Sequence, residues 1–192
     1  MANEIIGTYS RTAYVNIWDG TTIFQVEALM DTIDIDLGDK ESEFKPTLAG
    51  GRIEIQKPEE DTMVTFEGWF MGIGDTDDTT PDGLITKFMG GSDTTVPFAV
   101  TNTRTRGTYQ VFILWTDDTA ATIANSSIAS GANAMRFRGA GARLVSMKPS
   151  YTDKELKFTF KFRIPAYDLG GTGRIYWEST DGTGSMASLS TV

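Results

Sequence analysis

Neither histidine nor cysteine occurs in this 192-residue chain. Without cysteine there is no disulfide, no zinc–thiolate site and no thiol nucleophile, which fits a reducing compartment. Without histidine, no serine nucleophile can be paired with an imidazole base. Two carboxylates could still serve a glycosidase, but the 26 acidic residues offer no reason to choose one pair. We therefore expect a protein that is not an enzyme, and we assign no catalytic residue, cofactor or metal.

Long apolar runs are also missing. The first residues, 1–7, lack a basic start and an apolar stretch, so they predict no secretion signal. Nothing approaches the roughly 20 apolar residues of a membrane helix, so no membrane partner is expected. With 40% hydrophobic and 11% aromatic residues, the chain can still form one domain with a sizeable core over 1–192.

Acidic and basic residues are unevenly distributed. Residues 1–100 contain 19 acidic and 6 basic residues (net −13), whereas residues 101–192 contain 7 acidic and 11 basic ones (net +4). Two explanations remain open: the halves neutralise one another within a subunit, or oppositely charged surfaces meet when identical subunits join head to tail. A net charge of −9 makes the chain a poor candidate for gripping nucleic acid.

Apolar and polar side chains alternate without a break from Leu156 to Ile164. This alternation predicts a half-buried β-strand with Phe158, Phe160 and Phe162 in the core. A nearly continuous apolar run at 109–115 predicts a central strand covered on both faces. Further strands are expected at 13–18, 23–28 (joined by Asp19-Gly20), 33–37, 52–57, 62–72, 134–138, 143–147 and 174–178.

The predicted fold class is mainly β with one or two short helices, arranged as an antiparallel sandwich or barrel. One helix is expected after Thr80, with Pro81 in its first turn, and ends at Gly90-Gly91. A second, weaker helix is expected over 119–130. The small, polar residues 179–192 predict a flexible C-terminal tail.

A long hairpin with a mobile loop is expected over 31–57. Its acidic stretch, 39–45, is closed by Pro46 and is interpreted as the loop, which could reach a neighbouring subunit. The strand over 62–72 has an apolar second face, to be covered by a helix of the same chain or by another subunit. As residues of a subunit interface we predict Asp39, Lys40, Glu41, Glu43, Lys45, Trp69, Met71, Arg136 and Arg138.

Several other patterns have two interpretations. Arginines at 104, 106, 136, 138 and 143 could form a surface for single-stranded nucleic acid, but a polar face that pairs with the acidic half is favoured. The aspartates at 75–82 suggest a calcium loop, yet Thr80 and Thr86 occupy the EF-hand's glycine and glutamate positions, so a solvated loop is favoured. The glycine-rich segments 139–141 and 170–173 lack complete phosphate-binding motifs and predict turns.

The order of these elements resembles that of the tail tube proteins of long-tailed bacterial and archaeal viruses, whose fold is shared with the tubes of contractile injection systems. The resemblance covers most of the chain: an N-terminal hairpin, the Gly50–Ile55 run, the Thr65–Phe70 strand, a helical segment, and a closing pattern from Tyr151 to Ala166.

This resemblance implies a virion protein, assembled in the host cytoplasm, that polymerises as stacked rings, usually hexameric, into a hollow tail tube. Its partners would be its own copies and other tail proteins, and viral DNA would pass through the lumen without specific binding. Two alternatives remain: a capsid decoration protein, or a carbohydrate- or ligand-binding β-sandwich in which Trp18, Trp69 or Trp177 stacks on a sugar.

Overall fold

All strand pairs in the computed structural model are antiparallel, and the residues it describes contain no α-helix. The antiparallel β class predicted from the sequence is therefore confirmed. The described residues are 12–21, 23–28, 32–38, 42–48, 50–56, 60–69, 107–118, 120–121, 124–152, 155–181 and 183–189. The helix expected after Thr80 and the aspartates at 75–82 lie outside these ranges.

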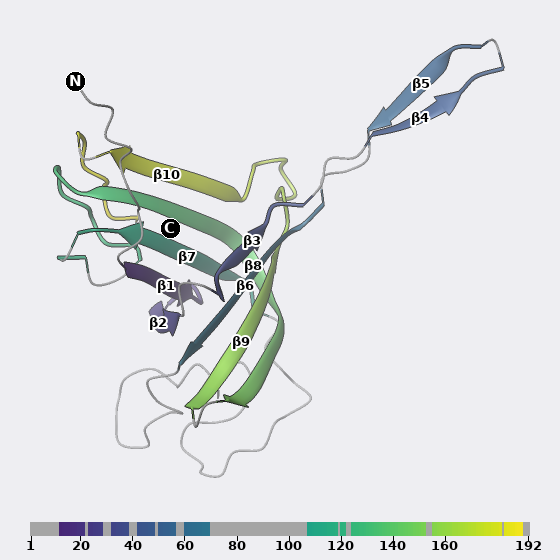
Figure 1. Ribbon diagram of the computed structural model, residues 1–192. Helices are drawn as coiled ribbons and strands as arrows, with labels where there is room; N and C mark the ends of the chain where they lie inside the picture. The colour runs from purple at the N-terminus through teal and green to yellow at the C-terminus, as the bar shows by residue number, and fades with distance from the viewer. Residues whose placement is uncertain are drawn as a thin grey trace.

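Ten strands are described (Figure 1). They are β1 (Thr12–Trp18), β2 (Ile23–Ala28), β3 (Asp34–Asp36), β4 (Ser42–Pro46), β5 (Arg52–Gln56), β6 (Thr62–Trp69), β7 (Tyr109–Thr116), β8 (Asn133–Thr152), β9 (Glu155–Ile164) and β10 (Ile175–Asp181).

Six of these strands pair in a closed circuit: β1 with β2, β2 with β6, β6 with β9, β9 with β8, β8 with β7, and β7 with β1. The long strand β8 allows this closure, because its first half pairs with β7 and its second half with β9 (Figure 1). A register shift between Leu144 and Ser146 marks a bulge, which bends a strand. Strands β10 and β3 lie outside the circuit, at the two ends of the sheet order.

Glycine lets β8 bend against the core. A Cβ at Gly139 would collide with the side chain of Ile164, and Gly141 has a φ of 69°, which favours glycine. The segment 139–141 is therefore part of a curved strand, not the turn that its composition predicted.

Aromatic side chains fill the space inside the circuit. Phe66 of β6 stacks on Phe160 and Phe162 of β9, with ring centroids 5.2 and 6.0 Å apart. Alternation along β9 places these side chains in the core and leaves Lys161 exposed, as the sequence predicts. Leu156 is the exception and is exposed, because it pairs with Tyr151 at the far end of the β8–β9 hairpin, beyond the core.

A second apolar cluster covers the outer face of β7 and β8. Phe112 and Leu114 of β7 pack there against Ile128 and Met186, all of them buried. Strand β7 is therefore covered on both faces, as its continuous apolar run predicts.

The segments that cover this outer face correct two predictions. Residues 120–121 and 124–130 form turns and a single β-bridge, so the helix expected over 119–130 is wrong. The expected flexible tail from Ser179 is also wrong for its described part, because 179–181 belong to β10 and Met186 is buried. Ile128 and Met186 exchange two backbone hydrogen bonds of 2.9 Å, which fix both segments to each other.

The hairpin expected over 31–57 has a different turn. Residues 34–36 pair with β6, whereas β4 pairs with β5, so the acidic stretch ends in a strand and the turn lies at 47–51. There the Gly50 N–H donates to the carbonyl of Thr47 at 3.0 Å, and Gly50 has a φ of 78°. The pattern was missed because both faces of β4 are exposed, so no apolar alternation marks that strand.

We expect Phe160→Ala to lower the free energy of unfolding by about 3–5 kcal/mol, because a fully buried ring is removed from a packed core. The neighbouring exposed change Lys161→Ala should cost less than about 0.5 kcal/mol. Urea denaturation of both variants measures the two values. Similar losses for both would contradict the register of β9.

Candidate subunit interface

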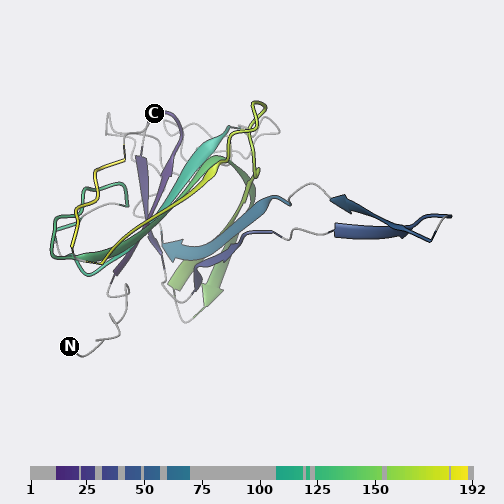
Figure 2. The ribbon, with the colours of Figure 1, turned by 90° about the horizontal axis from the view of Figure 1, so that it is seen from above.

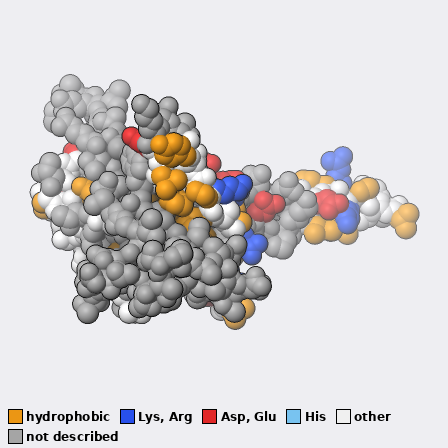
Figure 3. Space-filling view, turned by 90° about the horizontal axis from the view of Figure 1, so that it is seen from below, with side chains coloured by type: hydrophobic (Ala, Val, Ile, Leu, Met, Phe, Trp, Pro, Cys, Tyr) orange, Lys and Arg blue, Asp and Glu red, His pale blue; other side chains and the backbone are white. Residues whose placement is uncertain are grey.

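Strands β4 and β5 form an arm (residues 42–56) that projects away from the barrel (Figures 1 and 2). The two strands form a sheet of their own. Opposite residues in the arm share a face, so Glu43 and Lys45 lie with Ile55 and Ile53 on one side. Phe44 lies opposite Glu54 on the other side. On one face, the charged side chains of β4 therefore lie opposite the apolar side chains of β5, and on the other face Phe44 of β4 lies opposite the charged Glu54 of β5. Figure 3 shows apolar and charged side chains together on one face of the arm.

Large apolar side chains of the arm are open to solvent. Phe44 is 59% exposed, Ile53 56%, and Leu48 in the turn is fully exposed. A two-stranded hairpin is marginally stable in water by itself, and exposed apolar side chains in close array mark interaction sites. The arm therefore has the properties of a segment that is completed by a binding partner.

Two of the predicted interface residues lie on this arm. Glu43 and Lys45 are exposed and form a weak ion pair with a nitrogen–oxygen distance of 3.9 Å. Asp39, Lys40, Glu41 and Met71 lie outside the described residues. Trp69 pairs through its backbone with Glu27 of β2, and its side chain is not among those described.

Sequence reasoning missed the apolar residues of the arm. Phe44 was within a segment interpreted as a charged loop, and Ile53 and Ile55 were within a strand of the hairpin expected over 31–57. The signal that could have identified them is the alternation of Ile53-Glu54-Ile55, because the charged residues of the preceding segment offer this apolar face nothing to pack against.

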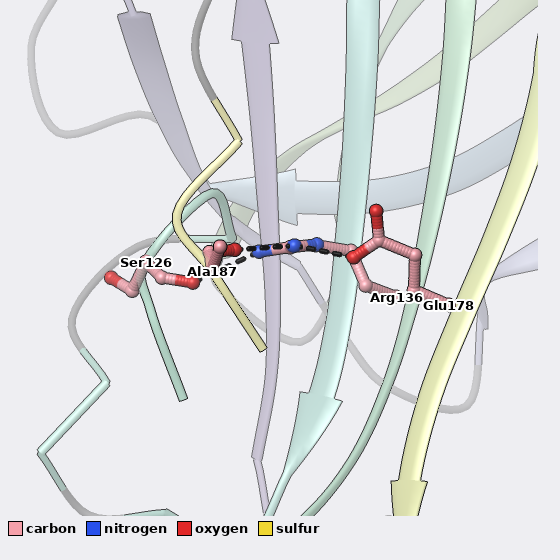
Figure 4. A network of polar contacts seen from close by, with 4 residues as sticks. All are labelled: Ser126, Arg136, Glu178 and Ala187. Carbon is pink, nitrogen blue, oxygen red and sulfur yellow. Dashed lines mark hydrogen bonds and ion pairs between the residues drawn. The ribbon is translucent and has the colours of Figure 1, made fainter. Parts of the chain in front are cut away.

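Arg136 does not lie on a free surface, which corrects its assignment to the interface. Its side chain is 1% exposed on β8 and points toward the segments that contain Ser126 and Ala187 (Figure 4). Its guanidinium donates to the carbonyls of Ser126 at 2.9 Å and Ala187 at 2.8 Å, and to the carboxylate of Glu178 on β10. The ion-pair partner of Arg136, Glu178, belongs to the second half of the chain and not to the acidic first half with which the alternating arginines were expected to pair.

Arg138 lies on the same face of β8, two residues further along, and is half-buried. Its Nε donates to the side-chain oxygen of Gln110 at 3.0 Å, and its guanidinium lies 5.3 Å from the ring centre of Tyr176. Of the five arginines considered for nucleic acid, Arg136 is therefore unavailable and Arg104 and Arg106 lie outside the described residues. Arg138 remains a candidate interface residue.

Apart from the two strands of the arm, the strand order of the main sheet has two open edges in the described part of the chain. Strand β10 pairs with β8 on one side, and β3 pairs with β6 on one side. Strand β10 also carries the half-exposed side chains of Tyr176 and Trp177. Open edges of this kind are templates for pairing with another chain.

The glycine segment 170–173 is a turn, as predicted. One carboxylate oxygen of Asp168 accepts hydrogen bonds from the backbone N–H groups of Gly170 and Thr172, both at 2.8 Å. The bond from the Thr172 backbone is the main cause that lowers the pKa of Asp168. Because Asp168 already occupies these N–H groups, they do not form a phosphate-binding loop.

The tryptophans proposed to bind a sugar lie apart. Trp18 packs against the second apolar cluster on the outer face of the sheet. Trp177 lies toward the opposite face, where it contacts Phe137 and stacks on Trp115 with ring centroids 6.1 Å apart. These two indoles therefore do not share a sugar-binding platform.

Within the described ranges, no group of three or more acidic side chains is arranged to hold a metal ion. The same ranges contain no helix with the length and hydropathy of a membrane span.

Comparison of the sequence with known protein families and with curated proteins gives no match. Solved structures are similar in fold. A chain of the anti-feeding prophage baseplate, in a 6-fold symmetrised cryo-EM structure, aligns over 88% of this chain and 93% of its own, with a TM-score of 0.50 and 10% identity.

Two further solved chains align over a similar length. One belongs to the tube terminating cap of the anti-feeding prophage (11% identity, 94% of this chain and 95% of that one, TM-score 0.49). Another belongs to the sheath–tube complex of an extracellular contractile injection system, PVC, in the extended state (10% identity, 93% and 95%, TM-score 0.49). At these identities the likeness is one of fold.

The contrast between the two arginines gives a stability prediction. Arg136→Glu should lower the free energy of unfolding by about 3–5 kcal/mol, because it places a carboxylate beside two carbonyls and Glu178 in a buried site. Arg138→Glu, at a half-buried position, should cost less. Thermal and urea unfolding of both variants test this difference, and equal costs would contradict the burial of Arg136.

Proposed function

We propose that this chain is a structural protein that joins copies of itself into rings and that the rings stack into a hollow tube. The observation that carries the proposal is the projecting arm with its exposed apolar residues. The similarity in fold to a chain from a 6-fold symmetrised baseplate supports it. The chain's own residues supply separate means for contacts within a ring and between rings.

Contacts within a ring would use the two open strand edges. Strand β10 lies at one end of the sheet order and β3 at the other. When the edge of β10 in one copy meets the edge of β3 in the next, the contact is head to tail, and such contacts close into rings. The exposed carboxylates of Asp34 and Asp36 on β3 then bring negative charge to the junction.

Contacts between rings would use the arm. It extends beyond the barrel, so it can reach a copy that does not share a sheet edge with its own (Figure 2). Docking through the face that carries Ile53 and Ile55 would bury these two side chains, which are exposed in the single chain. The charged residues opposite them, Glu43 and Lys45, would then orient the arm without supplying most of the affinity.

Within this proposal, the finer role is that of a tail tube protein in the virion of a long-tailed virus. The rings would be hexameric, other tail proteins would cap the tube, and the genome would pass through its lumen. The net charge of −9 supports passage without specific DNA binding, because an acidic wall repels phosphates. Assembly would take place in the host cytoplasm.

The arm can be tested by substitution. The double variant Ile53→Ser/Ile55→Ser should assemble at least tenfold more slowly than the unchanged chain, because it removes apolar area from the proposed contact. Its thermal unfolding should be unchanged, since the arm forms a sheet separate from the barrel. Glu54→Gln, on the opposite face of the same strand, is the matched control.

Light scattering gives the assembly rate, and negative-stain microscopy shows whether rings or tubes form. Tubes of normal length and rate from the double variant would refute the role of the arm. A chain that stays monomeric under all conditions would refute the whole proposal.

Salt dependence tests the role of charge between subunits. If the net −13 half of one copy meets the net +4 half of another, assembly should slow as sodium chloride rises. The reason is that the Debye length falls from about 10 Å at 0.1 M to about 3 Å at 1 M. Arg138→Glu should slow assembly further at low salt and leave the buried Arg136 in place.

Light scattering at several salt concentrations measures this effect. A rate that is indifferent to salt and to Arg138→Glu would mean that the contact is mainly apolar. In that case the opposite charges of the two halves neutralise one another within a single subunit.

A further inference from the structure

Residues 183–189, here called the C-terminal segment, are fixed to the outer face of the sheet by one buried side chain and a few hydrogen bonds. Met186 is the buried anchor and Leu189 packs partly buried against the same cluster, while Ser185 and Ala187 are exposed. Backbone hydrogen bonds join Met186 to Ile128, and the Leu189 N–H donates to the carbonyl of Asn125 at 3.2 Å. A short segment with one fully buried and one partly buried anchor belongs to the part of a fold that opens most easily.

This segment is also bonded to the edge strand β10 in two ways. The hydroxyl of Thr180 on β10 donates to the carbonyl of Gly184 at 3.0 Å. The guanidinium of Arg136 joins the carbonyl of Ala187 to the carboxylate of Glu178, which lies directly opposite Arg136 in the β8–β10 register (Figure 4). One nitrogen, Nη2, makes both of these bonds.

Strand β10 depends on such support because it pairs with a single strand, β8, in the described part of the chain. We propose that the C-terminal segment is a latch. When docked, it holds β10 in the paired form whose open edge can accept another copy of the chain, and when released, it lets β10 loosen. This inference rests on the proposed function in one respect, namely that the partner at the open edge of β10 is another copy of the chain.

The chemistry of Arg136 explains how the latch acts on β10. A guanidinium is a rigid planar fork, so its bonds to Ala187, Ser126 and Glu178 fix one another's direction. Release of the C-terminal segment removes the Ala187 carbonyl, so the guanidinium of Arg136 loses one of the acceptors that hold it in the docked chain. With fewer bonds to fix its direction, the guanidinium then holds Glu178 in a less defined position. Because the coupling free energy is reciprocal, pairing of β10 with β8 stabilises the docked C-terminal segment by as much as docking stabilises the pairing.

Hydrogen exchange of the free chain, below the concentration at which it assembles, tests the latch directly. Met186→Ala removes the anchor without touching Arg136 or β10, and Arg136→Met removes the fork but keeps an apolar stem. In both variants the amides of β10 should exchange about tenfold faster or more, as expected when hydrogen bonds to a charged group are lost. The amides of β9 should be unchanged and serve as the internal reference.

Ser188→Ala, at an exposed position of the same segment, is the matched control and should exchange like the unchanged chain. Unchanged exchange of β10 in Met186→Ala would overturn the latch, even if Arg136→Met fails to fold. The same variants should then assemble more slowly by light scattering. Loosened β10 amides with an unchanged assembly rate would overturn the control of assembly by the latch.

The two proposals can fail separately. If the unchanged chain never assembles but Met186→Ala still loosens β10, the proposed function fails while the tie between the C-terminal segment and β10 is upheld. If the unchanged chain assembles and Met186→Ala changes neither readout, the latch fails while the proposed function is upheld.

Discussion

The structure depends on one strand pairing with three others. Strand β8 pairs with β7 and β10 through its first half and with β9 through its second half. Its curvature closes the barrel around the stacked aromatic side chains of Phe66, Phe160 and Phe162. The bend requires close packing at Gly139, where only the absence of a side chain leaves room for Ile164. A straight β8 would separate the two groups of strands and expose the aromatic core to water.

Because β8 belongs to both groups of strands, its two faces lie in different surroundings. Phe137 faces the barrel interior, while Arg136 beside it faces the covered outer side. An arginine buried at that position is tolerated because two carbonyls and a carboxylate accept its hydrogen bonds. The same residue therefore contributes to the fold and links the edge strand to the C-terminal segment.

The sequence predicts those parts of the fold in which burial differs between the two faces of a strand. Strict alternation identified Phe158, Phe160 and Phe162 as core residues, and Asp19-Gly20 identified the β1–β2 hairpin. Periodicity could not predict a strand exposed on both faces, so β4 was interpreted as a loop. It also could not show that Met186, an apolar residue in a mostly polar tail, anchors a segment against partners distant in sequence. For the interface, charge pointed to Glu43 and Lys45, but the burial of Arg136 depends on tertiary contacts.

Closing the barrel leaves two strand edges that are protected to different degrees. Strand β3 has three residues and two exposed carboxylates, features that discourage uncontrolled pairing. Strand β10 has seven residues without lysine or proline, and it carries the half-exposed Tyr176 and Trp177. An unprotected edge of this length invites aggregation unless pairing is limited to one partner. A short acidic strand such as β3 can pair with only part of the open backbone N–H and C=O groups of β10. A ring built from this contact therefore needs β10 to be well ordered before the copies meet. That requirement gives a physical reason for bonding β10 to Arg136 and the C-terminal segment on its outer face.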